Sequence, residues 1–216
     1  MPRQDSNNAE IEAVIFDYGE VLAHRPSLAE FGQMASLFGM GAEPFSQVWD
    51  RSRPAYDRGD LTAEAYWLKL AAEVKAEIAP DQIERLRQWE VAMWSNINPA
   101  MVTWSTQLKD AGIKTAVLSN MHPDLVKHVR TFQWLQRFTV TTFSAEVKLV
   151  KPQAAIYEHT LRALDAVATK TLFVDDREVN IKAARSLGIR AIQFRSVPQL
   201  RGDLNDLDFP ILPSES

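Results

Sequence analysis

The chain has 216 residues, of which 46% are hydrophobic and 24% charged, a composition ordinary for a soluble globular protein that can bury a sizeable core. Its formal net charge of −4 offers no basic surface for a nucleic acid, and no apolar run approaches the roughly 18–20 residues needed to span a bilayer. The absence of cysteine excludes disulfides, thiolate metal sites and cysteine nucleophiles. Residues 1–12 are polar and lack the apolar core of a signal peptide, so we expect a cytoplasmic protein without nucleic-acid or membrane partners.

A short buried strand is the first element that the sequence predicts after residues 1–10, which we expect to be disordered. Residues 13–16 form a continuous apolar run of β-branched and aromatic side chains, and a turn begins at Asp17.

Residues 26–96 carry helical signals and no comparable strand. Ser27, Thr62 and Asp81 are each expected to cap a helix, because apolar residues follow each of them at spacings of three and four. Gly39 is expected to end the first of these helices. The pattern predicts a separate helical lobe inserted after the first strand.

Strands and helices alternate through the rest of the chain. The expected strands are residues 114–118, 138–143, 171–174 and 191–194, and the expected helices between them are residues 98–112, 123–132, 153–164 and 178–187. Such alternation predicts the α/β class, with a Rossmann-like, doubly wound parallel sheet and helices on both faces.

The predicted division of the chain follows from this pattern. A discontinuous catalytic core takes residues 11–25 and 97–200, and the inserted helical cap takes residues 26–96. Residues 1–10 and 201–216 are terminal segments.

Polar residues stand just past the predicted strands. Asp17, Ser119 and the pair Asp175 and Asp176 each follow an apolar run, and Lys151 follows the strand at 138–143. Ligands of open α/β sheets bind in the crevice outside the carboxyl ends of the strands. The sequence therefore predicts one site that combines carboxylates, a hydroxyl and a cation, a set suited to a metal ion and a phosphoryl group.

Asp17 is the natural nucleophile of this site, since a carboxylate can attack phosphorus and form an aspartyl-phosphate. Positive charge must offset the repulsion between the carboxylate and the phosphate, and Mg²⁺ together with Lys151 would supply it. Mg²⁺ prefers oxygen ligands, and the carboxylates of the predicted site are its main candidate ligands. Ser119 and the Asn120 amide are candidate donors to a phosphate oxygen.

The order of these motifs resembles that of the haloacid dehalogenase (HAD) superfamily, over residues 13–194. The matching runs begin at Phe16-Asp17, Leu118-Ser119, Lys151-Pro152 and Val174-Asp175. The helical insertion is similar to the cap of the branch that includes the phosphatase domain of epoxide hydrolases and the sugar-phosphate phosphatases.

The resemblance implies a role for each matching residue. Asp17 would be nucleophile and metal ligand, and Ser119 and Lys151 would bind phosphate. The implied Mg²⁺ ligands are Asp17, the carbonyl of Gly19, Asp175 and Asp176. Asn180 is expected to orient a neighbouring aspartate or loop.

Two positions depart from the family pattern. Gly19 stands where relatives usually have a second aspartate that protonates the leaving group, a contribution of about 10²–10⁴-fold. Some capped members also carry glycine there, and Glu20 is the obvious substitute acid. Lys148 stands where relatives often have glycine, and would either compete with Lys151 or be solvated.

These observations favour a Mg²⁺-dependent phosphatase, monomer or homodimer, acting on a small phosphorylated metabolite through an aspartyl-phosphate. One alternative is a hydrolytic 2-haloacid dehalogenase, in which the aspartate attacks carbon and no metal is needed. A second is a non-catalytic phospholigand-binding protein, which the glycine at position 19 motivates.

Overall fold

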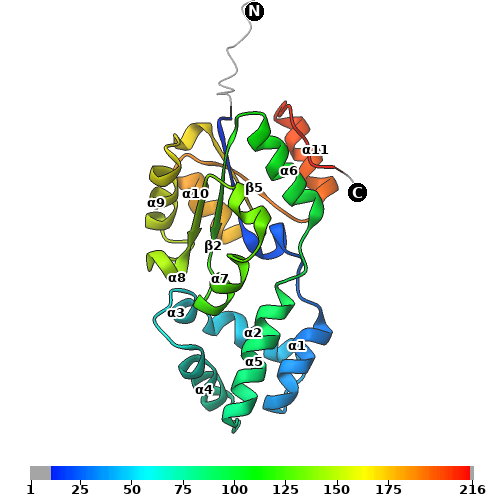
Figure 1. The fold of residues 1–216 in the computed structure, drawn as a ribbon, viewed down its shortest axis with the longest axis vertical. Helices are drawn as coiled ribbons and strands as arrows, with labels where there is room; N and C mark the ends of the chain where they lie inside the picture. Colours follow the sequence, from blue (N-terminus) through cyan, green and yellow to red (C-terminus); the bar gives the residue numbers. More distant parts are fainter. Residues whose placement is uncertain (1–10, 215–216) are drawn as a thin grey trace, which may run out of the picture.

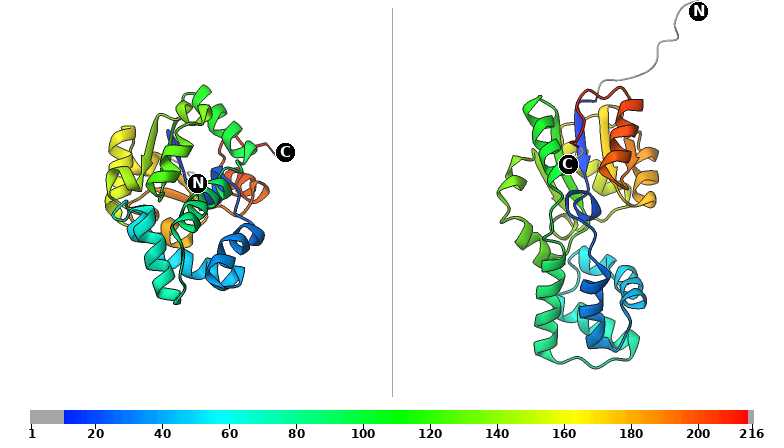
Figure 2. Two further views of the ribbon diagram at one scale, coloured as in Figure 1. Left: turned by 60° about the horizontal axis from the view of Figure 1, so that its bottom comes forward. Right: turned by 90° about the vertical axis from the view of Figure 1, so that its right-hand side faces the viewer.

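A computed structural model describes residues 11–214, so the predicted disorder of residues 1–10 lies outside the described part of the chain. Two lobes are stacked along the long axis, a sheet-containing core and a smaller helical lobe (Figures 1 and 2). No helix within residues 11–214 is both long and apolar enough to cross a membrane.

The core holds a five-stranded parallel sheet in the order β3-β2-β1-β4-β5. The strands are β1 Ala13–Phe16, β2 Lys114–Ser119, β3 Val140–Phe143, β4 Thr171–Asp175 and β5 Arg190–Gln193. Phe16 is in register with Val117 of β2 and with Val174 of β4. The register therefore brings Asp17 level with Asp175, next to the end of β2.

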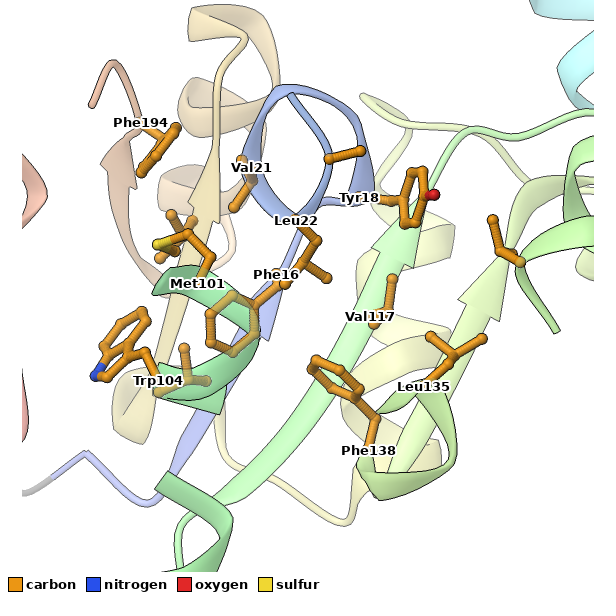
Figure 3. Packing of buried hydrophobic residues seen from close by; sticks show 14 of the residues in the cluster. Phe16, Tyr18, Val21, Leu22, Met101, Trp104, Val117, Leu135, Phe138 and Phe194 are labelled. Atoms are coloured by element: carbon orange, nitrogen blue, oxygen red, sulfur yellow. The ribbon is translucent and has the colours of Figure 1, made fainter. Parts of the chain in front are cut away.

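Helices cover both faces of this sheet, which confirms the doubly wound α/β fold. On one face lie α6 Pro99–Asp110, α7 Pro123–Val129 and α11 Val197–Asp206; on the other lie α9 Ala154–Leu164 and α10 Glu178–Ser186. Alternate residues of β1 serve the two faces: Phe16 packs edge-on against Trp104, with ring centroids 5.2 Å apart (Figure 3), whereas Ile15 joins the opposite cluster.

Helix α11 runs past residue 200, the predicted end of the core. Leu204 and Phe209 are buried in the same cluster as Phe16 and Trp104. This segment therefore covers the sheet. The division into a core of residues 11–25 and 97–200 and a cap of residues 26–96 otherwise stays a prediction.

The helical lobe has its own hydrophobic cluster. Its helices are α1 Leu28–Ala35, α2 Ala42–Ser52, α3 Pro54–Asp57, α4 Ala63–Val74 and α5 Pro80–Met93. The shorter elements within residues 11–214 are the loop η1 Tyr18–Leu22, the 3₁₀ turns η2 Ser36–Phe38, η3 Gln133–Arg137 and η4 Ala168–Lys170, and the single turn α8 Ser144–Val147.

Two of the three predicted caps are confirmed. Ser27 accepts a hydrogen bond from the N–H of Glu30 at 3.3 Å, and Thr62 accepts one from the N–H of Ala65 at 3.1 Å. The prediction for Asp81 was wrong, because α5 begins one residue earlier, at Pro80. Proline suits the first helical position, since the N–H that it lacks would have no partner inside the helix.

The cap is fastened to the core along one edge. The ammonium of Lys148 donates to the carbonyl of Gly59 at 2.7 Å, and the hydroxyl of Ser144 donates to the carbonyl of Asp57 at 2.5 Å. Gly59 has φ +72°, and a Cβ there would lie 2.6 Å from the ammonium. Lys148 is exposed, as one of the two predictions has it, and its hydrogen bond to Gly59 also ties the lobes together.

Candidate active site

A cleft of about 1090 Å³ lies where the carboxyl ends of the central strands meet the cap. Seven of the eight predicted site residues line it: Asp17, Gly19, Glu20, Ser119, Asn120, Lys151 and Asp176. The eighth, Asp175, is fully buried and contacts the ammonium of Lys151. The structure therefore brings all the predicted residues to one place.

Lys151 bridges two carboxylates at the base of the cleft. Its ammonium lies 2.8 Å from Asp17 Oδ1 and 2.7 Å from Asp175 Oδ2, and all three residues are buried. Burial opposes the charge of Lys151, but the carboxylates of Asp17 and Asp175 outweigh burial and raise its pKa. The lysine is therefore a permanent cation beside the candidate nucleophile.

Three carboxylates form a candidate metal site. Oxygen atoms of Asp17, Asp175 and Asp176 all lie within 4.8 Å of one another. Burial, opposed by Lys151 and reinforced by the neighbouring carboxylates, raises the pKa of Asp17 to about 8. Burial and the charge of Asp175 raise the pKa of Asp176 to about 7. A divalent cation would relieve this repulsion, and an all-oxygen donor set fits Mg²⁺.

Hydrogen bonds distinguish the three carboxylates. Asp175 Oδ1 accepts from the Arg177 N–H at 2.8 Å and from the Asn180 amide at 2.9 Å. Its Oδ2 accepts from Lys151 and, at 3.0 Å, from Asn180. Asp175 is thus already well supplied with donors, and Asn180 orients it as expected.

One carboxylate oxygen of Asp17 has no hydrogen-bond donor in the described part of the chain. The described donors to Asp17, the Tyr18 N–H at 2.7 Å and the Lys151 ammonium, are both on Oδ1. Oδ2 has no donor within residues 11–214, which leaves it for a cation or an electrophile. Asp17 and Asp176 therefore suit direct metal contact best, with Asp175 holding Lys151.

Asn120 holds the backbone of Lys151. Its side-chain carbonyl accepts from the Lys151 N–H at 2.8 Å, and its side-chain N–H donates to the Lys151 carbonyl at 2.9 Å. This places the lysine relative to the end of β2, where Ser119 is buried and lines the cleft. A direct contact of Ser119 or Asn120 with phosphate stays a prediction.

The loop after Asp17 shapes the next part of the cleft. Gly19 has an ordinary φ of −64°, and a Cβ there would come to 3.4 Å from the Trp94 ring, so a side chain is tolerated. Glu20 has φ 58° and lies half-buried beside Arg25, 3.8 Å away. Burial raises the pKa of Glu20, which suits a proton donor.

Sequence patterns missed several residues of the cleft. Trp94 lines it, and Asp50 of α2 pairs with Arg177 of the core, with both nitrogen–oxygen distances at 3.2 Å. Arg53, at the end of α2, also lines the cleft. The Asp50–Arg177 pair depends on α2, which showed no cap in the sequence.

Comparisons with known proteins agree with this architecture. The family model described as "haloacid dehalogenase-like hydrolase" matches residues 11–188. The chain is 27% identical over 203 residues to acyl-CoA dehydrogenase family member 10 of Mus musculus, covering 87% of this chain but only 18% of the mouse protein. It is 26% identical over 183 residues to the sesquiterpene phosphatase astK of Aspergillus oryzae, covering 82% of this chain and 87% of the fungal one.

Solved structures show the same fold. The HAD family enzyme BT-2542 of Bacteroides thetaiotaomicron, in complex with magnesium and inorganic phosphate, has a TM-score of 0.67 at 21% identity, covering 86% of this chain and 94% of that one. The L-2-haloacid dehalogenase of Xanthobacter autotrophicus has a TM-score of 0.66 at 18% identity, covering 95% and 90%. The family match spans most of the chain, and the chain belongs to the haloacid dehalogenase-like hydrolases.

Proposed function

We propose that this hydrolase is a Mg²⁺-dependent phosphatase that acts on a small phosphorylated metabolite through a phosphorylated Asp17. The observation that carries the proposal is the buried group of Asp17, Lys151, Asp175 and Asp176, which gathers three carboxylates and one fixed cation at the end of the sheet. A nucleophile in such a group needs a further cation before it can approach a phosphate dianion.

Each residue of the site would have a separate role in the reaction. Asp17 Oδ2 attacks phosphorus while the bond to the leaving oxygen breaks, and Lys151 and Ser119 stabilise the charge on the phosphoryl oxygens. Glu20 gives its proton to the leaving oxygen and then takes one from the water that attacks phosphorus, which releases phosphate and restores Asp17. Bound Mg²⁺, held by Asp17, Asp176 and the Gly19 carbonyl, would offset the negative charge of the reacting groups.

The relatives support this choice without deciding it. One is named a sesquiterpene phosphatase, and BT-2542 was crystallised with magnesium and phosphate. Haloacid dehalogenases have the same fold, but attack on carbon does not require a metal, and Asp176 then has no partner for its charge in the reaction. A binding protein would not need a nucleophile. A cytoplasmic location and a monomeric or homodimeric state stay predictions from the sequence.

Hydrolysis of an aryl phosphate separates the three functions. We expect turnover with Mg²⁺, its loss in excess chelator, and its return when Mg²⁺ is restored. Release of halide from 2-chloropropionate in chelator, without phosphatase activity, would establish the dehalogenase instead. Binding of phosphate without turnover of either compound would establish the phospholigand-binding protein.

A further inference from the structure

The cleft extends well beyond the space that a phosphate needs. Its volume of about 1090 Å³ lies just above the roughly 300–1,000 Å³ typical of small-molecule sites. Apolar side chains from both lobes line it, among them Leu28, Phe31, Trp94, Leu125, Val150 and Val179. The organic part of the substrate therefore has room and a largely hydrophobic wall.

Two of these side chains are unusually exposed. Within residues 11–214, the large apolar residues that are exposed are Leu28 at 66%, Val167 at 59%, Val179 at 49% and Leu68 at 45%. Single exposed apolar residues are common on protein surfaces. Leu28 of the cap and Val179 of the core, however, both line the catalytic cleft, whereas Leu68 and Val167 do not.

Trp94 places an indole ring beside the loop that follows Asp17. Its ring lies 3.4 Å from the position of a Cβ on Gly19, two residues after Asp17. The Tyr18 hydroxyl donates to the Trp94 carbonyl at 2.7 Å and holds the backbone there. Trp94 packs against the clusters of both lobes, yet none of the aromatic rings in the described part of the chain stacks on its indole. An indole in this position is a platform for an apolar group.

The cleft offers few uncharged groups that would recognise a sugar. Away from the phosphate end, the uncharged hydrogen-bonding side chains of the described lining are Ser46 and Gln47 of α2 and the indole of Trp94, and the Ser46 hydroxyl already donates to the Glu43 carbonyl at 2.8 Å. Each of the four arginines of the described lining has a carboxylate partner: Arg25 pairs with Glu20, Arg51 with Glu73, Arg53 with Asp57 and Arg177 with Asp50. A polyol would have to compete with these ion pairs for most of its hydrogen bonds.

We propose that the substrate is a phosphate monoester of an apolar alcohol, with the hydrocarbon part packed on Trp94 and in contact with Leu28 and Val179. The inference rests on the proposed phosphatase function and adds the chemical class of the leaving group. Trp94, Leu28 and Val179 are then the specificity-determining residues.

A series of straight-chain alkyl phosphates, from ethyl to octyl, tests the proposal with Mg²⁺ present. We expect kcat/KM to rise by up to about four-fold for each CH₂ that the cleft buries, and to exceed the values for glycerol phosphate and glucose 6-phosphate. Turnover that is independent of chain length, or a preference for the two polyol phosphates, would overturn the proposal.

The four exposed apolar residues supply matched variants. Leu28→Gln and Val179→Asn should each lower the ratio of octyl to ethyl phosphate kcat/KM by about 3- to 10-fold, since each removes part of an apolar contact. Leu68→Gln and Val167→Asn make the same changes outside the cleft and should leave the ratio unaltered. Equal ratios in all four variants would contradict the assignment.

Binding of alkylphosphonates separates this inference from the phosphatase function, because phosphonates are not hydrolysed. Calorimetry on the wild-type protein with Mg²⁺ should show octylphosphonate binding more tightly than ethylphosphonate. If this difference appears without any phosphatase activity, the proposed function fails and the apolar cleft stands. If phosphate esters are hydrolysed and the two phosphonates bind equally, the apolar substrate is wrong and the phosphatase stands.

Discussion

Replacing Lys151 by methionine should destabilise the metal-free protein and make it depend on Mg²⁺. The ammonium is buried between Asp17 and Asp175, at 2.8 and 2.7 Å. Removing one partner of a buried ion pair costs about 3–5 kcal/mol, because the remaining charge stays buried without its countercharge. Since 1 kcal/mol changes the Tm of a protein of this size by about 2–4 °C, Lys151→Met should lower Tm by about 6–20 °C in chelator at pH 8.

The same variant has a pH dependence with a definite sign. The variant lacks the Lys151 charge, which opposes the burial that raises the pKa of Asp17. The folded variant then binds a proton that the unfolded chain releases, so its deficit in Tm should shrink between pH 8 and pH 6. Mg²⁺ should raise the Tm of the variant more than that of the wild type, because it supplies the missing positive charge.

Thermal unfolding followed by circular dichroism measures these changes, with Lys182→Met as the control. Lys182 pairs with Glu178 at 2.6 Å on the surface of α10, with both side chains more than half exposed, and such pairs contribute about 0–1 kcal/mol. A Lys151→Met protein with a Tm within about 2 °C of the control in chelator at pH 8 would refute the reasoning.

Three further outcomes follow from the same site. Asp17→Asn should keep the fold and lose several powers of ten in kcat, and retention of more than roughly a tenth of wild-type kcat would exclude Asp17 as the nucleophile. Glu20→Gln should slow alkyl phosphates by about 10²–10⁴-fold and aryl phosphates much less, since only alkoxide leaving groups need a proton; equal losses for both classes would point to a different acid. The metal-free protein should lose stability as pH rises from about 4 towards 7, because the folded pKa of Asp176, about 7, exceeds its unfolded value. The stability of Asp176→Asn should decline less steeply over this pH range. Identical pH profiles of the two proteins would contradict the raised pKa of Asp176.

The sheet, and the edge of it that carries the candidate site residues, were predictable because both depend on the local pattern of apolar and polar residues. Residues 13–16 are apolar throughout, as a strand covered on both faces requires, and the observed β1 has these bounds. Parallel pairing then sets Asp17 level with Asp175 without further information. The predicted strands, and the rule that ligands bind at their carboxyl ends, were therefore sufficient to gather the carboxylates and Lys151.

The part of the cleft that the helical lobe forms was not predictable from local sequence patterns. Helix α2 begins after Gly41 without a capping side chain and carries Pro44 in its first turn, so no start signal marks it. The contact between Trp94 and Gly19 joins residues far apart in the sequence, and depends on where α5 ends relative to the nucleophile loop. Lys148 likewise gains its role only when Gly59 of the cap comes within reach.

Trapping the covalent intermediate tests the central claim most directly. The protein is quenched in acid during turnover of an aryl phosphate, treated with borohydride, and digested for mass spectrometry. Borohydride reduces an aspartyl-phosphate to homoserine, so we predict homoserine at position 17 only in samples that contained both substrate and Mg²⁺. Full phosphatase activity with Asp17 unmodified, or reduction at a different carboxylate, would contradict the account.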